Sequence, residues 1–152
     1  MKKLSRIGGL LKKLYRNYSM ELLEGLGERG FNDLRPSFLE VLLQICESDG
    51  PSIKLVGDLC GLKKQTMTSH LNELEKRGYI LRKTNQEDRR EQNLYLTDYG
   101  EKFKLALFET IDFLEKKYVE TCGAVELERI EHQLNKFFEN TRNMNDELGF
   151  DL

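Results

Sequence analysis

The chain is poor in several residue types and in long apolar runs. It has no tryptophan, only two prolines and only three cysteines in 152 residues. No apolar run reaches the length of a membrane span, and further charges soon break the basic start at 1–11, unlike a secretory signal. We therefore expect a cytoplasmic protein without a membrane partner.

The cysteines Cys46, Cys60 and Cys122 are odd in number and widely spaced, and none belongs to a Cys-x-x-Cys pair. This excludes a disulfide framework and a zinc finger. We expect all three as small apolar side chains in helix cores. A redox-sensing thiol stays open as the alternative.

The inventory for catalysis is equally poor. With only His70 and His132, the chain has no His-x-x-x-His zinc pair, and it has no phosphate-binding glycine loop or Gly-x-Ser-x-Gly elbow. Its acidic residues fall at ordinary spacing on solvated helix faces. The sequence therefore predicts no enzyme, no metal and no cofactor.

What the chain does have is a charge pattern. Hydrophobic residues make up 39% and charged residues 33%, which fits one helical globular domain over 1–152. The net charge is −2, yet the segment 51–97 holds nine Lys/Arg against six Asp/Glu. This basic excess falls on one segment, where contacts to phosphates would have to be made.

Apolar spacing predicts a mainly α protein with a small β-hairpin. Pro36, Ser52 and Thr97 are suited to helix starts, whereas Gly61 and Gly78 are suited to helix ends, and we expect Gly57 to weaken its helix slightly. The expected helices cover 4–26, 36–46, 52–59, 63–77, 98–122 and 125–138, and the expected strands cover 79–83 and 93–97.

Residues 52–97 then form a winged helix-turn-helix, in which a helix fits the major groove and the hairpin tip reaches the adjacent backbone or minor groove. On the 63–77 helix, Met67, Leu71 and Leu74 share an inward sector, and His70 at its edge is interpreted as packing. The candidate DNA-binding residues are Lys63, Lys64, Gln65, Thr66, Thr68, Ser69, Asn72, Arg89 and Arg90, with Asp88 as a wing-structuring residue. The alternative is a solvated helix face and an idle hairpin.

Two motifs in register carry a resemblance. Asp88-x-Arg90 followed by Leu96-Thr97-x-x-Gly100 is similar to the wing signature of MarR-family regulators. Upstream, 66–68 and 74–80 resemble that family's recognition helix and its exit into the wing.

The resemblance implies a homodimer that binds double-stranded DNA at a pseudo-palindromic operator. It further implies a DNA-binding lobe at 35–100 and a helical dimerisation region at 1–34 and 101–152, whose apolar surplus calls for a partner. That surplus includes Leu22, Leu23, Phe103, Leu107, Leu114, Phe137 and Phe138. The expected function is a repressor relieved by a small-molecule effector or an oxidant; a winged helix that binds protein instead of DNA is the alternative.

The chain departs from the family pattern at Ser69 and Glu73, where basic residues are common. Glu73 cannot pair with Asp88, so Arg77 or Arg82 would have to replace the family's helix-to-wing salt bridge. In the family, effectors bind between the lobe and the dimer body. The residues of that region here, Tyr15, Tyr18, Phe38, Leu42 and Phe103, are interpreted as plain core.

Overall fold

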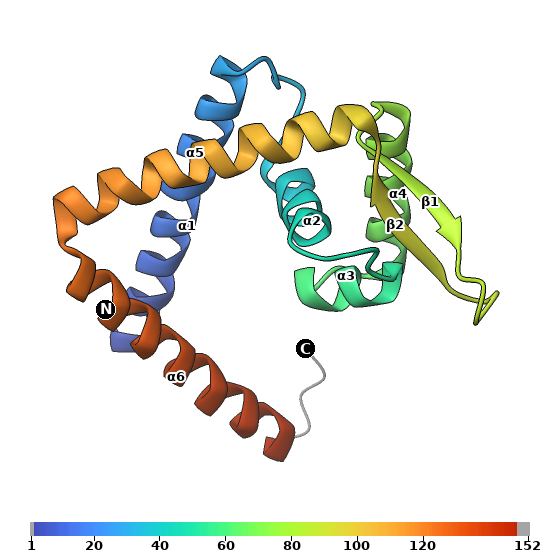
Figure 1. The fold of residues 1–152 in the computed structure, drawn as a ribbon. Helices are drawn as coiled ribbons and strands as arrows, with labels where there is room; N and C mark the ends of the chain where they lie inside the picture. The colour runs from blue at the N-terminus through green and yellow to red at the C-terminus, as the bar shows by residue number, and fades with distance from the viewer. Residues whose placement is uncertain (1, 149–152) are drawn as a thin grey trace. The chain divides into compact units, whose positions relative to one another are not determined.

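The computed structural model of the protein describes residues 2–148, so residues 1 and 149–152 of the predicted helical region lie outside the described residues. Six helices and two strands follow one another in this part of the chain (Figure 1). They are α1 (Lys3–Glu28), α2 (Pro36–Cys46), α3 (Ile53–Cys60), α4 (Lys64–Lys76), β1 (Ile80–Thr84), β2 (Gln92–Leu96), α5 (Asp98–Cys122) and α6 (Ala124–Leu148). The chain divides into two compact units, 1–111 and 112–152.

The residues that begin and end the helices are those the sequence singles out. Pro36 occupies the first turn of α2, and the Ser52 hydroxyl accepts a hydrogen bond from the Leu55 N–H at 3.0 Å, which caps α3. Gly61 and Gly78 follow α3 and α4 with positive φ angles of 64° and 85°. The predicted mainly α fold with one hairpin is confirmed.

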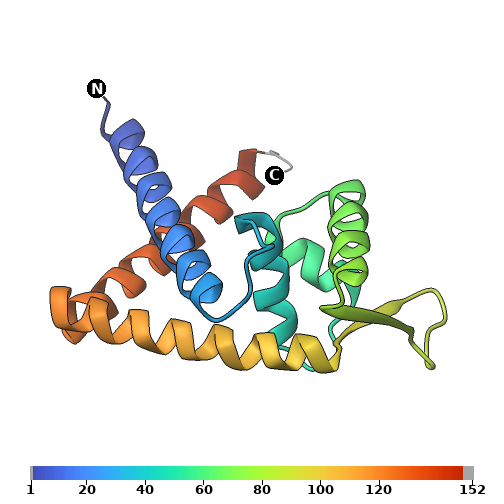
Figure 2. The ribbon, with the colours of Figure 1, turned by 90° about the horizontal axis from the view of Figure 1, so that it is seen from above.

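The hairpin is antiparallel, with register running from Ile80 opposite Leu96 to Thr84 opposite Gln92. It is fastened to the start of α3, because the Leu94 N–H donates to the Pro51 carbonyl at 2.9 Å. Figure 2 shows α4 and the hairpin side by side. The wing base is therefore held by α3 as well as by α4.

The core of the first unit draws on each of its helices and on both strands. Met67, Leu71 and Leu74 are 3% exposed or less, which confirms the predicted inward sector of α4. Their buried neighbours in this unit include Leu22, Leu26, Phe38, Leu42, Val56, Tyr79, Ile80, Leu94, Phe103 and Leu107. This packing holds α4 with its opposite face toward solvent.

Gly57 does not simply weaken α3, as the sequence suggests. It is buried, and a Cβ at this position would lie 3.2 Å from Cγ of Met67 and 3.7 Å from the Leu62 carbonyl. Glycine therefore lets α3 approach α4 closely, and alanine would crowd Met67.

Two of the predicted core tyrosines lie at the surface. Tyr15 is 44% exposed and Tyr18 is 38% exposed, because the described residues of the first unit do not cover the face of α1 that carries them. Phe38, Leu42 and Phe103 are buried as predicted.

Only one of the three cysteines lies in a core. Cys46 is buried, and burial raises the pKa of its thiol to about 12. Cys60 is half-buried and Cys122 is exposed, so the prediction is wrong for Cys122.

The predicted apolar surplus is also smaller than expected. Leu22, Phe103, Leu107 and Leu114 are at most 8% exposed within the single chain, whereas Phe137 and Phe138 are 40% and 64% exposed. Other large apolar side chains exposed in the described part of α6 are Val125, Ile130, Leu134 and Met144. None of the helices in the described part of the chain combines the length and apolar character needed to cross a membrane.

Candidate nucleic-acid interface

The turn between α3 and α4 sets the angle of the second helix. The Gly61 N–H donates to the Asp58 carbonyl at 3.2 Å and the Leu62 N–H donates to the Gly57 carbonyl at 3.0 Å, which closes the end of α3. The left-handed Gly61 then redirects the chain, and Lys63 opens α4 in an extended conformation without a side-chain cap. The first N–H groups of α4 are therefore not satisfied by a capping side chain.

The outer face of α4 carries the side chains that the sequence predicts there. Gln65, Thr66, Thr68, Ser69 and Asn72 are all exposed. The Thr68 hydroxyl donates to the Lys64 carbonyl at 2.9 Å and retains its acceptor lone pairs. This face can both donate and accept hydrogen bonds.

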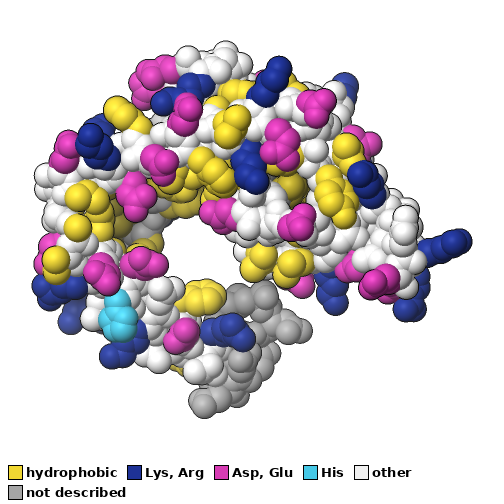
Figure 3. Space-filling model, in the orientation of Figure 1, with side chains coloured by type: hydrophobic (Ala, Val, Ile, Leu, Met, Phe, Trp, Pro, Cys, Tyr) yellow, Lys and Arg dark blue, Asp and Glu magenta, His cyan; other side chains and the backbone are white. Residues whose placement is uncertain are grey.

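The basic residues around α4 differ in whether they form ion pairs. Lys63 and Lys64 are exposed, and neither has an ion pair within 4.0 Å in the described part of the chain. In Figure 3, Lys and Arg side chains project at the edge of the face where the hairpin lies, with acidic side chains close by. The interface is thus mixed in charge, and two unpaired cations lie at the start of the helix.

Asn72 has a hydrogen-bond partner in the hairpin that the sequence does not reveal. The Arg82 guanidinium donates to Oδ1 of Asn72 and to Oε2 of Glu75, the latter at 2.8 Å. This pair of contacts ties β1 to the middle of α4. The Asn72 oxygen accepts the bond from Arg82, and its side-chain amide, on an exposed residue, can still donate hydrogen bonds.

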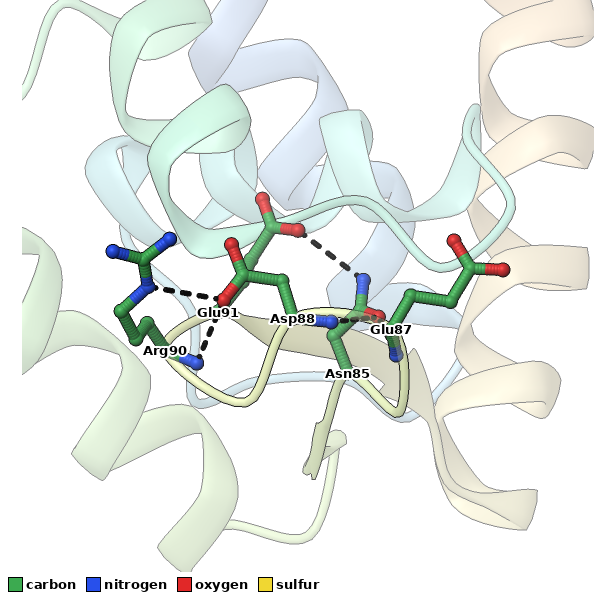
Figure 4. Close-up of polar contacts among 5 residues, drawn as sticks. All are labelled: Asn85, Glu87, Asp88, Arg90 and Glu91. Carbon is green, nitrogen blue, oxygen red and sulfur yellow. Dashed lines mark hydrogen bonds and ion pairs between the residues drawn. The ribbon is translucent and has the colours of Figure 1, made fainter.

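The wing loop is organised by Asn85 (Figure 4). Its Oδ1 accepts hydrogen bonds from the Glu87 and Asp88 N–H groups at 2.9 and 3.2 Å, and its Nδ2 donates to Glu91 Oε2 at 3.2 Å. Our sequence reasoning missed this residue. The signal for such a turn is an asparagine at the end of a strand, because its side-chain oxygen can accept from the backbone N–H groups two and three residues further on.

Asp88 and Arg90 make a second group of hydrogen bonds within the wing loop. Asp88 Oδ1 accepts from the backbone N–H of Arg90 at 3.1 Å and from its Nε at 3.3 Å (Figure 4). The Arg90 side chain is still 92% exposed, and Arg89 beside it is exposed as well. These contacts fit the wing-structuring role predicted for Asp88.

No substitute for the family's helix-to-wing salt bridge reaches Asp88 in the described residues. Arg77 pairs with Glu73 at 3.0 Å and Arg82 pairs with Glu75 at 2.8 Å, so both arginines are held by α4 itself. Within the described residues, the wing is joined to α4 at its base, through Arg82, and not at its tip.

A cleft of about 580 Å³ lies between α3, the start of α4 and the wing. Apolar side chains line part of this cleft. Its charged lining residues are three cations and three anions: Lys54, Lys64, Arg90, Asp58, Asp88 and Glu91. Lys54 was not among the predicted site residues, although it lines this cleft together with Lys64. Within the described residues, no three His, Cys, Asp or Glu side chains gather as a metal site.

His70 lies on the inner side of α4, where the sequence interpretation placed it. It is 7% exposed, and its ring stands edge-on to Phe38 with centroids 5.0 Å apart. Burial, and secondarily the charge of Arg35, lowers the pKa of His70. A neutral packed histidine follows from this position.

Comparison with known proteins agrees with this geometry. Residues 33–91 match a model of the MarR family. The HTH-type transcriptional regulator TtmR of Methylorubrum extorquens (strain PA1) is 36% identical over 69 residues, which are 45% of this chain and 35% of TtmR. The match therefore spans only about a third of that relative's length.

Solved structures share the fold across most of the chain. A MarR transcriptional regulator from Methanosarcina mazei Go1 has a TM-score of 0.77 at 19% identity, covering 92% of this chain and 99% of that one. FabT of Streptococcus pneumoniae, crystallised in complex with DNA, has a TM-score of 0.74 at 22% identity, with 93% and 99% covered. The similarity to the MarR family model is confined to residues 33–91, and the likeness to the solved structures shows that the chain has their fold.

Proposed function

We propose that the protein is a homodimeric transcriptional regulator that binds double-stranded DNA with α4 and the wing. The observation that carries the proposal is the exposed polar face of α4, whose start is flanked by the unpaired Lys63 and Lys64. A helix of this kind fits the major groove, where its first residues meet the base edges. FabT, which shares the fold, is crystallised with DNA, and TtmR is named as a transcriptional regulator.

In this proposal the residues divide the work by chemistry. Gln65, Thr66, Thr68, Ser69 and Asn72 reach base edges and nearby phosphates, while Lys63 and Lys64 bind phosphate. Arg89 and Arg90 enter the adjacent minor groove, where negative potential attracts guanidinium groups. The conformation of the wing loop determines where these two arginine side chains enter the groove.

The pairing of Arg90 with Asp88 does not oppose this role. Both side chains are largely exposed, and ion pairs at exposed sites contribute little to stability. Arg90 can exchange Asp88 for DNA at low cost, while the Asp88 contact to the Arg90 backbone keeps the loop in shape.

The dimer is proposed from uncovered apolar surface. Helices α1 and α6 expose large apolar side chains, among them Leu4, Leu10, Leu14, Ile130 and Phe138. Several large exposed apolar side chains along one helix indicate a surface that a partner covers, and a second copy would close a symmetric pair. We therefore assign dimerisation to 1–34 and 101–152 and DNA binding to 35–100, with half-sites about 10 bp apart or a multiple of that.

We further propose that the dimer represses transcription and that a small ligand or an oxidant relieves repression. Each effector must favour one arrangement of the two lobes over the other. The thiol version is open to a direct check. If alkylation of Cys46, Cys60 and Cys122 leaves operator affinity unchanged, no thiol switch operates.

The central experiment selects bound duplexes from a random pool and measures their affinity as salt is raised. Contact with about six to ten phosphates should weaken binding about a thousandfold or more between about 50 and 200 mM salt. Arg90→Ala and Lys64→Ala should weaken binding and lower the salt dependence, because each removes a cation from the interface. Lys116→Ala, an exposed lysine of α5, is the matched control and should change neither.

Two outcomes would contradict the proposal. A folded protein with no attraction to any duplex at low salt would exclude DNA binding. A flat salt response would favour the alternative, a winged helix that binds protein.

A further inference from the structure

Three side chains meet where the loop after α1 passes the end of α4. The Tyr79 hydroxyl donates to Oδ1 of Asp33 at 2.6 Å. The Arg77 guanidinium donates to the backbone carbonyl of Asp33, and its Nη1 lies 4.0 Å from Asp33 Oδ2. We call Asp33, Arg77 and Tyr79 the Asp33 clamp. It joins the loop between α1 and α2 to Arg77, the C-cap residue of α4, and to Tyr79 at the start of the wing.

Tyr79 makes the clamp a fixed point. Its side chain is fully buried, and its ring packs against Phe31, Tyr99 and Phe103 with centroids 5.0 to 6.4 Å apart. A buried hydroxyl that loses its partner is costly, so the contact with Asp33 is strongly preferred. Burial and the bond to Asp33 raise the pKa of Tyr79, which keeps the hydroxyl protonated as a donor.

Arg77 connects the Asp33 clamp to α4. Its Nε donates to Glu73 Oε2 at 3.0 Å, and its guanidinium lies 5.1 Å from the centre of the Phe38 ring. A planar guanidinium with partners on several sides has little freedom to rotate. The last turn of α4 is therefore held against the loop by a group of fixed geometry.

The position of this last turn governs the reading face. Twelve residues separate Gln65 from Arg77, a lever of about 18 Å at the helical rise per residue. A tilt of about 5° at Arg77 would move Gln65 by about 1.6 Å, more than the range of hydrogen-bond lengths allows. Contacts to base edges would be lost before contacts to phosphates, because lysine side chains can follow the backbone.

We propose that Asp33 is a positioning residue for sequence reading: it holds α4, through Arg77 and Tyr79, at the angle that base contacts require. The inference rests on the proposed DNA-binding function. It assigns a role to a residue that lies outside the helix-turn-helix and the wing.

The test measures specific and non-specific affinity separately, with the selected operator and a scrambled duplex of equal length. Asp33→Ala and Asp33→Asn should lower the ratio of specific to non-specific affinity by about 5- to 30-fold. Non-specific affinity and the salt dependence should stay within about twofold, since no phosphate contact is removed. Tyr79→Phe should lower the ratio less than Asp33→Ala, and it should have little further effect in the Asp33→Ala background.

Asp49→Asn is the matched control, because Asp49 is an exposed carboxylate of another loop. Both Asn variants remove one negative charge, so any general gain in DNA attraction appears in both. Only Asp33→Asn should lose specificity. Asp33→Glu, which retains the charge, should recover part of the ratio.

Hydrogen exchange tests the clamp without DNA. Asp33→Asn should speed exchange about tenfold or more in the last turn of α4 and leave α3 unchanged. If the wild type binds no duplex, the proposed function fails and exchange alone decides on the clamp. An unchanged α4, an unchanged specificity ratio, or an equal loss of specific and non-specific binding would each overturn the inference.

Discussion

His70 shows how one residue can make the lobe sensitive to acid. Its ring is buried against Phe38, and its Nδ1 has no hydrogen-bond partner in the described chain. The Arg35 guanidinium lies 4.2 Å from the centre of the same Phe38 ring. Burial first, and the charge of Arg35 second, lower the pKa of His70 below 6.5. A proton on His70 would add a third cation beside this ring, after Arg35 and Arg77.

We therefore expect the free energy of unfolding to fall as the solution is acidified below about pH 6.5. The unfolded chain binds the proton near its ordinary pKa, whereas the folded chain binds it only at lower pH, so the unfolded state gains. The contribution is fully present above the unfolded pKa and is lost as pH falls through the folded pKa. Urea unfolding at about pH 7.5, 6.5 and 5.5 measures it.

Two variants assign the effect. His70→Leu should flatten the acid dependence, because the buried titrating group is removed. His132→Gln should leave it unchanged, since His132 is exposed on α6. An equally steep dependence in His70→Leu would assign acid sensitivity to other groups.

Single residues differ in how far the sequence predicts them. The exposure of Gln65 and Ser69 follows from helical spacing, because Met67 and Leu71 must face the core. The partners of Arg82 do not follow, since Asn72 lies ten residues away and only the folded hairpin brings the two together. Local geometry can be predicted at this scale, and long-range pairing cannot.

At the scale of elements, the Leu96-Thr97-x-x-Gly100 signature has a physical reason. The Thr97 hydroxyl accepts from the Gly100 N–H at 2.9 Å, which caps α5, and donates to the carbonyl of Gly78. A Cβ on Gly100 would lie 2.1 Å from the carbonyl oxygen of Tyr79. The first turn of α5 therefore rests directly on the backbone that leads into β1.

We expect Gly100→Ala to destabilise the protein by about 1 to 3 kcal/mol or more, because the obstacle is backbone and cannot rotate away. Gly9→Ala is the matched control: Gly9 also lies inside a helix, and a Cβ there meets nothing within 4 Å. Replacing it should be neutral or stabilise by up to about 1 kcal/mol. Chemical denaturation of both variants measures the difference, and equal effects would contradict the packing argument.

The elements themselves are more predictable than their contacts. Pro36, Ser52 and Gly61 mark boundaries through local conformational preference, so their helices begin and end close to the predicted residues. The close approach of α3 to α4 at Gly57 depends on a neighbour supplied by the next helix, Met67. On an isolated helix, a glycine inside the helix would indicate only a lower stability of that helix.

For the whole molecule, the order of elements is enough to predict the winged helix-turn-helix lobe. It is not enough to predict which apolar positions stay at the surface. Phe103 and Phe138 are equivalent in an amphipathic pattern, yet Phe103 is 0% and Phe138 is 64% exposed. That distinction depends on packing between distant segments, and it indicates where a second copy would bind.

The proposed dimer gives the last prediction. Leu134→Glu and Phe138→Glu place charge on the exposed apolar face of α6 and should shift the protein from dimer to monomer, because an unpaired charge in an apolar interface is costly. Gln133→Glu adds the same charge at an exposed polar position of the same helix and should remain dimeric. Sedimentation of the three variants and the wild type over a range of concentrations measures the association. Operator affinity should fall along with dimerisation, since one lobe alone contacts one half-site; a monomeric variant with undiminished affinity would separate DNA binding from the dimer.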